Sequence, residues 1–530
     1  LYYSSFGTHA DIAYNLAINL KGAALKSMQD FKNYIYGTQN RILIDGYENL
    51  RKLEKKLCYT TSVDDIEILR NKIYNLERNL LVELNNNPIP ASFWEDVKAN
   101  LERSAVSVEF VDYMISDSEY QYAALILCKD WDSPKMIPLC KKSDLDPLIK
   151  RLQDIYNSTS HRDSAESYIY KRLYSFVWSK LDPYLNEGDN VYFSPSGLLH
   201  QINVGVLKDA AGRQANEKYN LFRVSSTREL CMKKPVNQWK TAVLFGDLVY
   251  DVDSTMMLAQ SRAYLSDEFN NDTASRGFVP DLMHRAGWSQ LSNTAEEVNA
   301  IDRLLSSKRI GTAKYMQYAG NEESFKALSG KKTSIIHLAT HGFFFKDEET
   351  KAKPFFEMLD MNQHQYRPDN SLKRSGLILA GGQRAWLGEP IPDNVEDGIL
   401  LAEEIAAMDL SGTDLVVLSA CETGLGEITS EGVFGLQRAF KKAGVQTLVM
   451  SLWKVHDAAT SLMMRTFYKN LLDGKSKRDA FAMAQQTVKE KYENPYYWPR
   501  SSCSIKRYRV ILRKGNPPGL PFLFLFDLWV

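Results

Sequence analysis

Apolar residues recur at steps of three and four positions through most of the first 90 residues, which is the spacing of one face of an α-helix. The stretch at 11–37 (DIAYNLAINLKGAALKSMQDFKNYIYG) follows this pattern, and 47–84 repeats it with Lys, Glu and Arg interleaved. One or two helix pairs are too few to show a repeat period. The end of a helical solenoid and a plain helical hairpin therefore fit equally well. The run NNNPIP at 85–90 breaks the pattern and marks a boundary.

Short apolar runs that alternate with helical patterns follow this boundary. A helix at 93–101 precedes strand-like runs at 107–115 and 122–130, and a helical stretch follows at 165–185. Further strands are expected at 190–195, 241–247, 314–320, 333–340, 413–420 and 446–453. Helical patterns lie between several of them, at 295–305, 323–328, 432–444 and 457–472. This alternation predicts an α/β fold with a mostly parallel sheet flanked by helices. Runs such as SIIHLA and LVVLSA, apolar at nearly every position, fit strands that are buried on both faces.

Composition excludes some classes of function. The chain has 530 residues, 44% of them hydrophobic and 25% charged, as in an ordinary globular protein. Its 65 Lys and Arg balance its 65 Asp and Glu, which argues against binding to nucleic acid or an anionic membrane, since both favour a basic excess. No apolar run reaches the roughly 20 residues that span a membrane. The sequence starts at Leu1 rather than Met, which indicates a fragment.

The six cysteines are spread through the chain and form neither a CxxC pair nor a cluster with histidine. This spacing argues against a structural zinc site and against a secreted disulfide framework. We therefore expect reduced thiols and a cytoplasmic protein. The cysteines are Cys58, Cys128, Cys140, Cys231, Cys421 and Cys503.

Two of the expected strands end in residues that can do chemistry. The strand at 333–340 runs into His341 and Gly342, and the strand at 413–420 runs into Cys421. Sites in open α/β sheets form beyond the carboxyl ends of the strands, so a thiol and an imidazole would meet there if these strands are neighbours. The thiolate is the reactive nucleophile, and an imidazole can take its proton. The backbone amides of Gly342 and Cys421 are the candidate oxyanion hole.

Other interpretations of these residues stay open. A free cysteine usually packs as a small hydrophobe, and one Cys/His pair is a weak signal. His337 lies inside its strand and is expected to be a buried structural histidine, and His200, after the SPSG turn, is interpreted as structural too. His456 follows another strand, where a pocket role and an exposed loop position are both possible.

At these residues the sequence resembles the CHAT family of caspase-like domains, which are often attached to tetratricopeptide (TPR) repeats. HxxTHG together with a strand ending in SACETG is the specific combination. The matching segments are YFSPSGLLHQINVGVL (192–207), HLATHGFF (337–344), SGLILAGG (375–382), DGILLAEEIAAMDLSGTDLVVLSACETGLGE (397–427), SEGVFGLQRAFKKAGVQTLVMSLWKVHDAAT (430–460) and MMRTFYKNLLDG (463–474). The resemblance implies a fold like that of caspases and separases. It also implies cysteine endopeptidase chemistry with His341 and Cys421 as the catalytic dyad, and no metal or organic cofactor.

The boundary and the resemblance together predict four regions. They are a helical segment at 1–88 that ends a set of TPR-like repeats, an N-terminal β/α part of the CHAT region at 89–160, the caspase-like peptidase domain at 161–498 and an atypical tail at 499–530. After NPYYW (494–498), family members typically continue into an apolar strand, whereas this chain continues with a basic, breaker-rich run. Without that last strand, one edge of the sheet would be exposed.

Acidic residues near the site are the candidates for substrate binding. The similar separases place an acid for a basic substrate residue after the strand that corresponds to 446–453, and an acid there would favour cleavage after Arg or Lys. Asp457 fits this role and an N-cap role equally well. Glu431 fits the same role or a first-turn position in a helix, and Glu422 is a candidate for orienting the loop beside the nucleophile.

Two functions from different classes follow. The first is a cysteine endopeptidase that cleaves proteins or peptides and is regulated through its N-terminal helices, where a regulatory protein would bind. The second is a catalytically silent CHAT/TPR scaffold for protein–protein interaction. Neither needs nucleic acid or a membrane as a partner.

Overall fold

The structure is a computed structural model of the whole chain. It describes residues 9–21, 40–58, 92–116, 119–157, 163–231, 239–264, 287–344, 374–419, 427–429, 432–451, 457–492 and 501–505, together with isolated positions between 35 and 80 and at 372.

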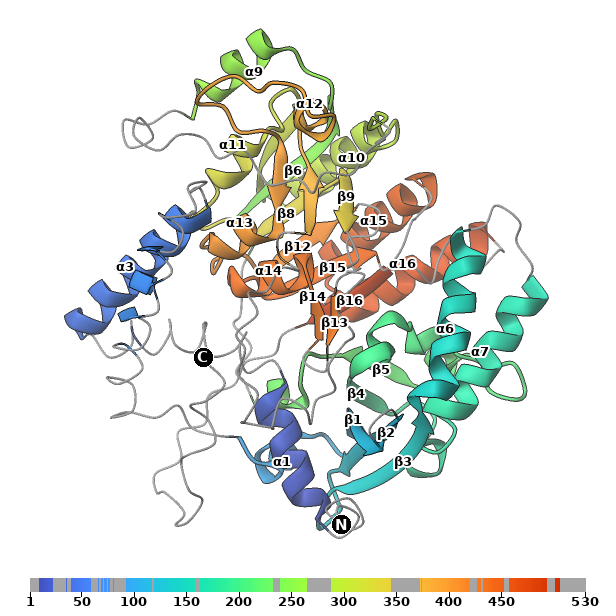
Figure 1. Cartoon of the computed structure of the whole chain (residues 1–530). Coiled ribbons are helices and arrows are strands. Elements are labelled where there is room, and N and C mark those ends of the chain that lie inside the picture. Colours follow the sequence, from blue (N-terminus) through green and yellow to red (C-terminus); the bar gives the residue numbers. More distant parts are fainter. Residues whose placement is uncertain are drawn as a thin grey trace.

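The central sheet has six strands in the order β16-β15-β12-β8-β6-β7 (Figure 1). Every neighbouring pair is parallel except β15 and β16, which are antiparallel. The predicted fold class, a mostly parallel α/β sheet flanked by helices, is therefore confirmed. The strands are β6 (Thr241–Leu248), β7 (Gly311–Gln317), β8 (Ile335–Leu338), β12 (Leu415–Leu418), β15 (Thr447–Ser451) and β16 (Ser501–Ile505).

Both faces of this sheet are covered, which explains why its middle strands are apolar at consecutive positions. Ile335 and Val417 face α10 (Thr294–Ser307), α15 (Asp457–Leu472) and α16 (Lys477–Lys491). Ile336 and Leu418 belong to the opposite face, where α11 (Glu322–Lys326), α13 (Ala402–Ala407) and α14 (Leu436–Lys442) pack. Since successive strand residues point to opposite faces, a strand between two helical layers has no position for a solvated side chain.

A second sheet of five strands precedes the central one, in the order β3-β2-β1-β4-β5. The strand predicted at 190–195 was expected beside those of the central sheet, and this was wrong: it forms β4, parallel to β1. The reason is the helical crossover through α6 (Lys142–Asn157) and α7 (Asp163–Val177), which returns the chain to the edge of β1. The strands are β1 (Ala105–Ser116), β2 (Glu119–Cys128), β3 (Lys135–Lys141), β4 (Asn190–Ser194) and β5 (Asn220–Arg223).

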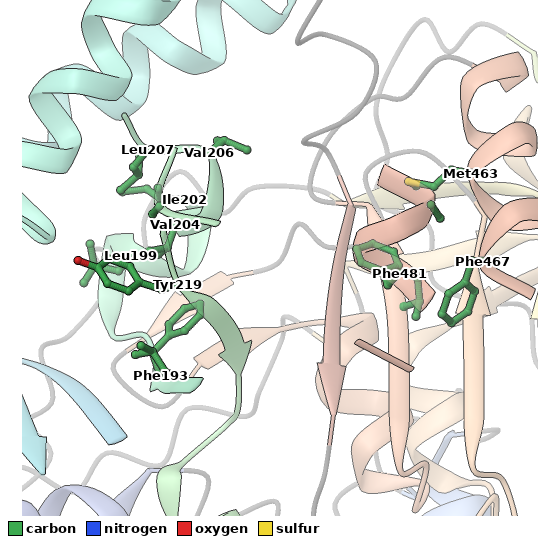
Figure 2. Packing of buried hydrophobic residues seen from close by; sticks show 14 of the residues in the cluster. Phe193, Leu199, Ile202, Val204, Val206, Leu207, Tyr219, Met463, Phe467 and Phe481 are labelled. Atoms are coloured by element: carbon green, nitrogen blue, oxygen red, sulfur yellow. The ribbon is translucent and has the colours of Figure 1, made fainter. Parts of the chain in front are cut away.

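The two sheets share one hydrophobic core. Figure 2 shows Phe193 of β4 and Leu199 with their neighbours on one side, and Met463, Phe467 and Phe481 of α15 and α16 on the other. In addition, β5, at the edge of the second sheet, lies against β16, at the edge of the central sheet. The last strand of the sheet is therefore present despite the unusual sequence: the segment after Trp498 supplies β16, which pairs with the edge of β15.

The N-terminal helices contact the second sheet and a helix that covers the central sheet. The phenol of Tyr14 in α1 (Ala10–Leu20) lies 2.7 Å from both Ser107 Oγ and Thr227 Oγ1. Lys21 follows α1, and its buried ammonium lies 2.9 Å from the buried carboxylate of Glu109 in β1. The longer helix α3 (Arg41–Cys58) lies against α13 of the central sheet (Figure 1). Within the described part of the chain, no helix combines the length and the hydropathy needed to cross a bilayer.

Some predicted elements begin or end at different residues. The run at 432–444 was predicted to be helical throughout, but its first residues form β14 (Gly432–Phe434), which pairs with β13 (Glu427–Thr429) before α14 begins. The strand predicted at 314–320 ends at Gln317 and begins earlier, at Gly311. The helix at 457–472 was predicted with its observed bounds.

A small antiparallel sheet, not predicted, extends from the carboxyl end of β8. It consists of β9 (His341–Phe344), β10 (Ser375–Ile378) and β11 (Ile399–Leu401) in the order β11-β10-β9. Ile378 lies opposite His341 on one side and Ile399 on the other. The first candidate catalytic residue is therefore the first residue of a strand, which fixes its backbone.

Gly398, just before β11, has no room for a side chain. Its φ is 78°, and a Cβ there would lie 2.4 Å from the backbone nitrogen of Gly382. We expect Gly398→Ala to lower the free energy of unfolding by about 3 kcal/mol or more, since left-handed strain adds to a backbone clash. Chemical denaturation would measure this. Gly188 is a matched control with φ 88° and no neighbour within 4 Å, so alanine there should cost only about 1–2 kcal/mol. Equal losses at both positions would contradict the clash.

Candidate active site

His341 lies at the carboxyl edge of the central sheet, between two aromatic rings. Its imidazole centroid is 5.0 Å from that of Tyr250 and 4.8 Å from that of Trp288. Tyr250 follows β6, and Trp288 lies in the segment that leads into α10. Rings at these distances restrict the rotation of the imidazole and shield its faces from water.

A backbone carbonyl fixes the protonation pattern of this imidazole. His341 Nε2 lies 2.7 Å from the carbonyl oxygen of Ser289. Because a carbonyl can only accept, Nε2 must carry the proton, and Nδ1 of the neutral ring is left as the acceptor. This is the nitrogen that could take a proton from a nucleophile.

The segment that carries Ser289 is itself anchored. The backbone nitrogen of Trp288 donates to Gln383 Oε1 at 2.8 Å. Thr294, the first residue of α10, donates its hydroxyl to Leu291 O at 2.7 Å and accepts from Asp247 N at 2.9 Å. The carbonyl that orients His341 is thus tied to the end of β6.

The strand order reverses at this point in the sheet. From β6 the chain moves outward to β7, whereas β8, β12 and β15 follow one another on the other side. Such a reversal opens a crevice at the carboxyl ends of the strands, where open α/β sheets bind ligands. His341 follows β8, so it lies at this crevice.

The structure describes only some of the predicted site residues. Cys421, Glu422 and Glu431 lie outside the described residues, as does His456. Asp457 is the first residue of α15, and its side chain is not among those described. Gly342 is buried in β9, opposite Leu377 of β10.

The strand that leads to Cys421 is nevertheless described, and it is the neighbour of the strand that leads to His341. β12 pairs with β8 in parallel, with Leu418 opposite Leu338. The backbone nitrogen of Ser419 donates to Leu338 O at 2.8 Å, so the pairing continues one residue beyond β12. The expectation that these two strands are adjacent is confirmed.

His337 is buried, as predicted. Its Nε2 lies 2.9 Å from Glu297 Oε1 of α10, and both side chains have at most 1% of their surface exposed. Its Nδ1 lies 3.4 Å from the hydroxyl of Tyr468 in α15. Burial raises the pKa of Tyr468 well above its usual value, with a smaller contribution from the charge of Glu297. The His337–Glu297 contact ties β8 to the helix that follows Ser289.

The aromatic neighbours of His341 were not foreseen from the sequence. Trp288 lies against Trp386 of α12 (Gly382–Trp386) at 4.8 Å, and Trp386 lies against Phe343 at 5.3 Å. These residues come from segments far apart in the chain that carry no regular pattern. No local signal in the sequence connects them.

One group of acids in the described part of the chain has the spacing of metal ligands. Oxygen atoms of Glu322, Glu396 and Glu404 lie within 4.8 Å of one another. The ammonium of Lys326 contacts all three, at 2.7, 2.9 and 2.7 Å. A cationic group of the protein thus already occupies the centre of these acids, so the group does not fit a metal site.

Two known proteins match part of this chain in sequence. Tetratricopeptide repeat protein 28 is 26% identical over 316 residues in Homo sapiens and 32% over 312 residues in Mus musculus. These matches cover 57% of this chain, which spans only 11% of the length of either relative.

Two solved structures overlap partially with this one. The Arg-specific cysteine proteinase gingipain R is 10% identical, with a TM-score of 0.34, over 70% of this chain and 74% of that chain. A Saccharomyces cerevisiae separase–securin complex is 8% identical, with a TM-score of 0.37, over 92% of this chain and 38% of that chain.

The family comparison covers the whole central sheet. The model of the CHAT domain matches residues 169–505, which is more than half of the chain and runs from α7 through β16. The chain therefore belongs to the CHAT domain family.

Proposed function

We propose that this protein is a cysteine endopeptidase that uses Cys421 as nucleophile and His341 as general base. The observation that carries the proposal is the register of β8 and β12. Leu338 and Leu418 lie opposite each other, and His341 and Cys421 each follow their leucine by three residues. Equal offsets from paired residues on parallel neighbours favour a thiol and an imidazole at one level of the same sheet edge.

The orientation of His341 supports its role as base. With Nε2–H donated to Ser289 O, the lone pair of the neutral ring is on Nδ1, and this nitrogen would accept the thiol proton of Cys421. The thiolate then attacks the carbonyl carbon of the scissile peptide bond, and the developing oxyanion would be held by the amides of Gly342 and Cys421. Collapse of this intermediate breaks the C–N bond. Protonated His341 gives its proton to the departing amine and leaves a thioester on Cys421.

Deacylation reuses the same groups. His341 takes a proton from water, and the resulting hydroxide attacks the thioester carbonyl. The C–S bond breaks, the new carboxyl group leaves, and the imidazolium returns its proton to the sulfur. We propose Asp457 and Glu431 as the acids that would favour a basic residue before the cleaved bond, and Glu422 as the acid that would orient the loop beside the nucleophile.

Labelling with a thiol-reactive probe tests this assignment. A dilute fluorescent chloroacetamide at neutral pH should label the wild type and not Cys421→Ala, since only an activated thiolate reacts quickly. Burial raises the pKa of Cys128 to about 11 and that of Cys140 to about 12, so these thiols should stay protonated and unlabelled. Cys231→Ala, at a partly buried cysteine, serves as the matched control and should label as the wild type does. Equal labelling of the wild type and Cys421→Ala would refute the proposal.

A second candidate function is a catalytically silent scaffold. It is favoured by the relatives, which are named for their tetratricopeptide repeats, and by the N-terminal helices, which pack on the second sheet and on α13. Proteomics on cells that express the wild type or Cys421→Ala separates the two functions. New protein termini found with the wild type alone would support the enzyme and would also reveal the residue before the cut. Shared binding partners and identical termini would support the scaffold.

A further inference from the structure

A partly buried cation at the end of β5 lacks an acidic partner. Arg223 Nη2 donates to Nδ1 of His200 at 3.1 Å and to the carbonyl oxygen of His200 at 3.3 Å. No carboxylate within the described ranges lies at ion-pair distance from its guanidinium. Burial lowers the pKa of Arg223 to about 10. Buried charges are normally paired, as Lys21 is with Glu109 in the same sheet.

The histidine beside it has an unsatisfied donor. His200 is 8% exposed, and the bond from Arg223 requires a lone pair on Nδ1, so the proton of the neutral ring sits on Nε2. Burial lowers the pKa of His200 well below its usual value, and the charges of Arg223 and Lys21 add to this, so the ring is neutral at physiological pH. The Nε2 atom is buried, and no acceptor lies within reach of it among the described residues.

We propose that Arg223 and His200 form a binding site for a carboxylate. The groups left without partners are donors, so the missing partner is an acceptor. The charges indicate what kind of acceptor it is. Glu109 neutralises Lys21, and His200 is neutral, which leaves the single positive charge of Arg223 to be balanced. A carboxylate carries one negative charge and matches the planar fork of a guanidinium, whereas a phosphate would leave excess negative charge in a partly buried place.

The position of the site suggests a peptide as the source of the carboxylate. His200 lies in the short helix η3 (Gly197–Gln201) at the carboxyl end of β4, and Arg223 ends the neighbouring strand β5. The strands β13 and β14 both contact η3, and β16 lies against β5. The site thus lies where the two sheets meet, beside the hairpin that follows Cys421 in sequence. An acidic side chain of a peptide bound along this junction would fill it. The site does not depend on the proposed peptidase activity.

Pairs of ligands that differ only in the carboxylate test the site. A blocked hexapeptide with one glutamate is compared with its glutamine counterpart, and N-acetylglycine with N-acetylglycinamide. We expect the acid of a pair, and not its amide, to raise the unfolding midpoint by about 2 °C or more in a saturable way. Arg223→Gln should abolish the shift. Arg213→Gln, which removes an exposed arginine paired with Glu187, should keep it.

If Arg223→Gln does not fold, NMR spectra of histidine in the wild type test the same site. With ¹⁵N-labelled histidine, the His200 resonance, identified by its loss in His200→Gln, should show the Nε2–H tautomer and shift with the acid of a pair. A response to the glutamate peptide alone assigns the site to an acidic side chain in a peptide, and a response to N-acetylglycine alone assigns it to a small or C-terminal carboxylate. Equal responses to acid and amide, or an unchanged His200 resonance with every ligand, overturn the proposal.

Discussion

Replacing His341 with alanine is expected to lower kcat/KM for peptide cleavage by about 100- to 10,000-fold, the usual contribution of a positioned general base. The imidazole is held by Ser289 O and by the rings of Tyr250 and Trp288, so the variant removes a base that is already oriented. The rate of alkylation of Cys421 at neutral pH should fall as well, because the thiol would lose the group that takes its proton. Both rates can be measured, and the second needs no known substrate.

The control for this variant is His9→Ala. His9 is exposed at the start of α1, so its loss should leave both rates within about twofold of the wild type. Chemical denaturation of His341→Ala should give a transition close to that of the wild type, since the side chain is only partly buried. Unchanged alkylation and cleavage in His341→Ala would remove this residue from the mechanism, whatever the role of Cys421.

The strands around the candidate site could be predicted because burial on both faces leaves a strong pattern. β8 and β12 are four residues each, fully buried and apolar except for His337. That histidine could be separated from His341 by its position inside the strand, and its contact with Glu297 agrees with this. Sequence reasoning worked here because the layer arrangement dictates the residue types directly.

The assignment of strands to sheets could not be predicted. β4 carries the same kind of apolar run as the central strands, yet it pairs with β1. What decides its place is the length and packing of the crossover through α6 and α7, which is a tertiary property. The strands β9, β10 and β11 are only three or four residues long, too short for alternation to identify them.

The neighbours of His341 could not be predicted from the sequence for a different reason. A backbone carbonyl orients the ring, and every residue has a carbonyl, so Ser289 carries no signal. Trp288 and Trp386, whose rings contact each other at a tilt, come from two segments that meet only in the folded chain. The unpaired charge of Arg223 is likewise visible only once its neighbours are known.

The largely buried side chain of Lys326 holds together three elements next to the site. It contacts Glu322 in its own helix α11, Glu396 before β11 and Glu404 in α13. Glu322 also accepts from Gly398 N at 2.9 Å, and Glu404 accepts from Leu401 N at 2.8 Å. The cluster therefore supports both ends of β11, which continues through β10 to the strand that starts at His341.

The acids around Lys326 make stability depend on pH. Burial raises the pKa of Glu322 well above its usual value, against the opposing effect of Lys326. Burial also raises the pKa of Glu323 to about 7 from its ordinary 4.5. Below its unfolded pKa, such an acid is protonated in both states and costs no stability. As the pH rises from the unfolded pKa to the raised folded pKa, only the unfolded state releases the proton, so the free energy of unfolding falls. Glu323 alone should thus cost about 3 kcal/mol of stability between pH 4.5 and 7 and little more above it.

Replacing Lys326 with methionine is expected to lower the free energy of unfolding by about 3–5 kcal/mol at pH 8, because three buried carboxyl groups lose the cation that they share. The loss should shrink towards pH 5, where the acids with raised pKa values bind protons and no longer repel one another. Denaturant titrations of the wild type and Lys326→Met at both pH values would measure the difference. Lys331→Met, at an exposed lysine shortly after α11, should change stability by less than about 0.5 kcal/mol at either pH. A loss that is equal at pH 5 and pH 8 would mean that packing of the aliphatic stem, rather than charge, is what Lys326 contributes.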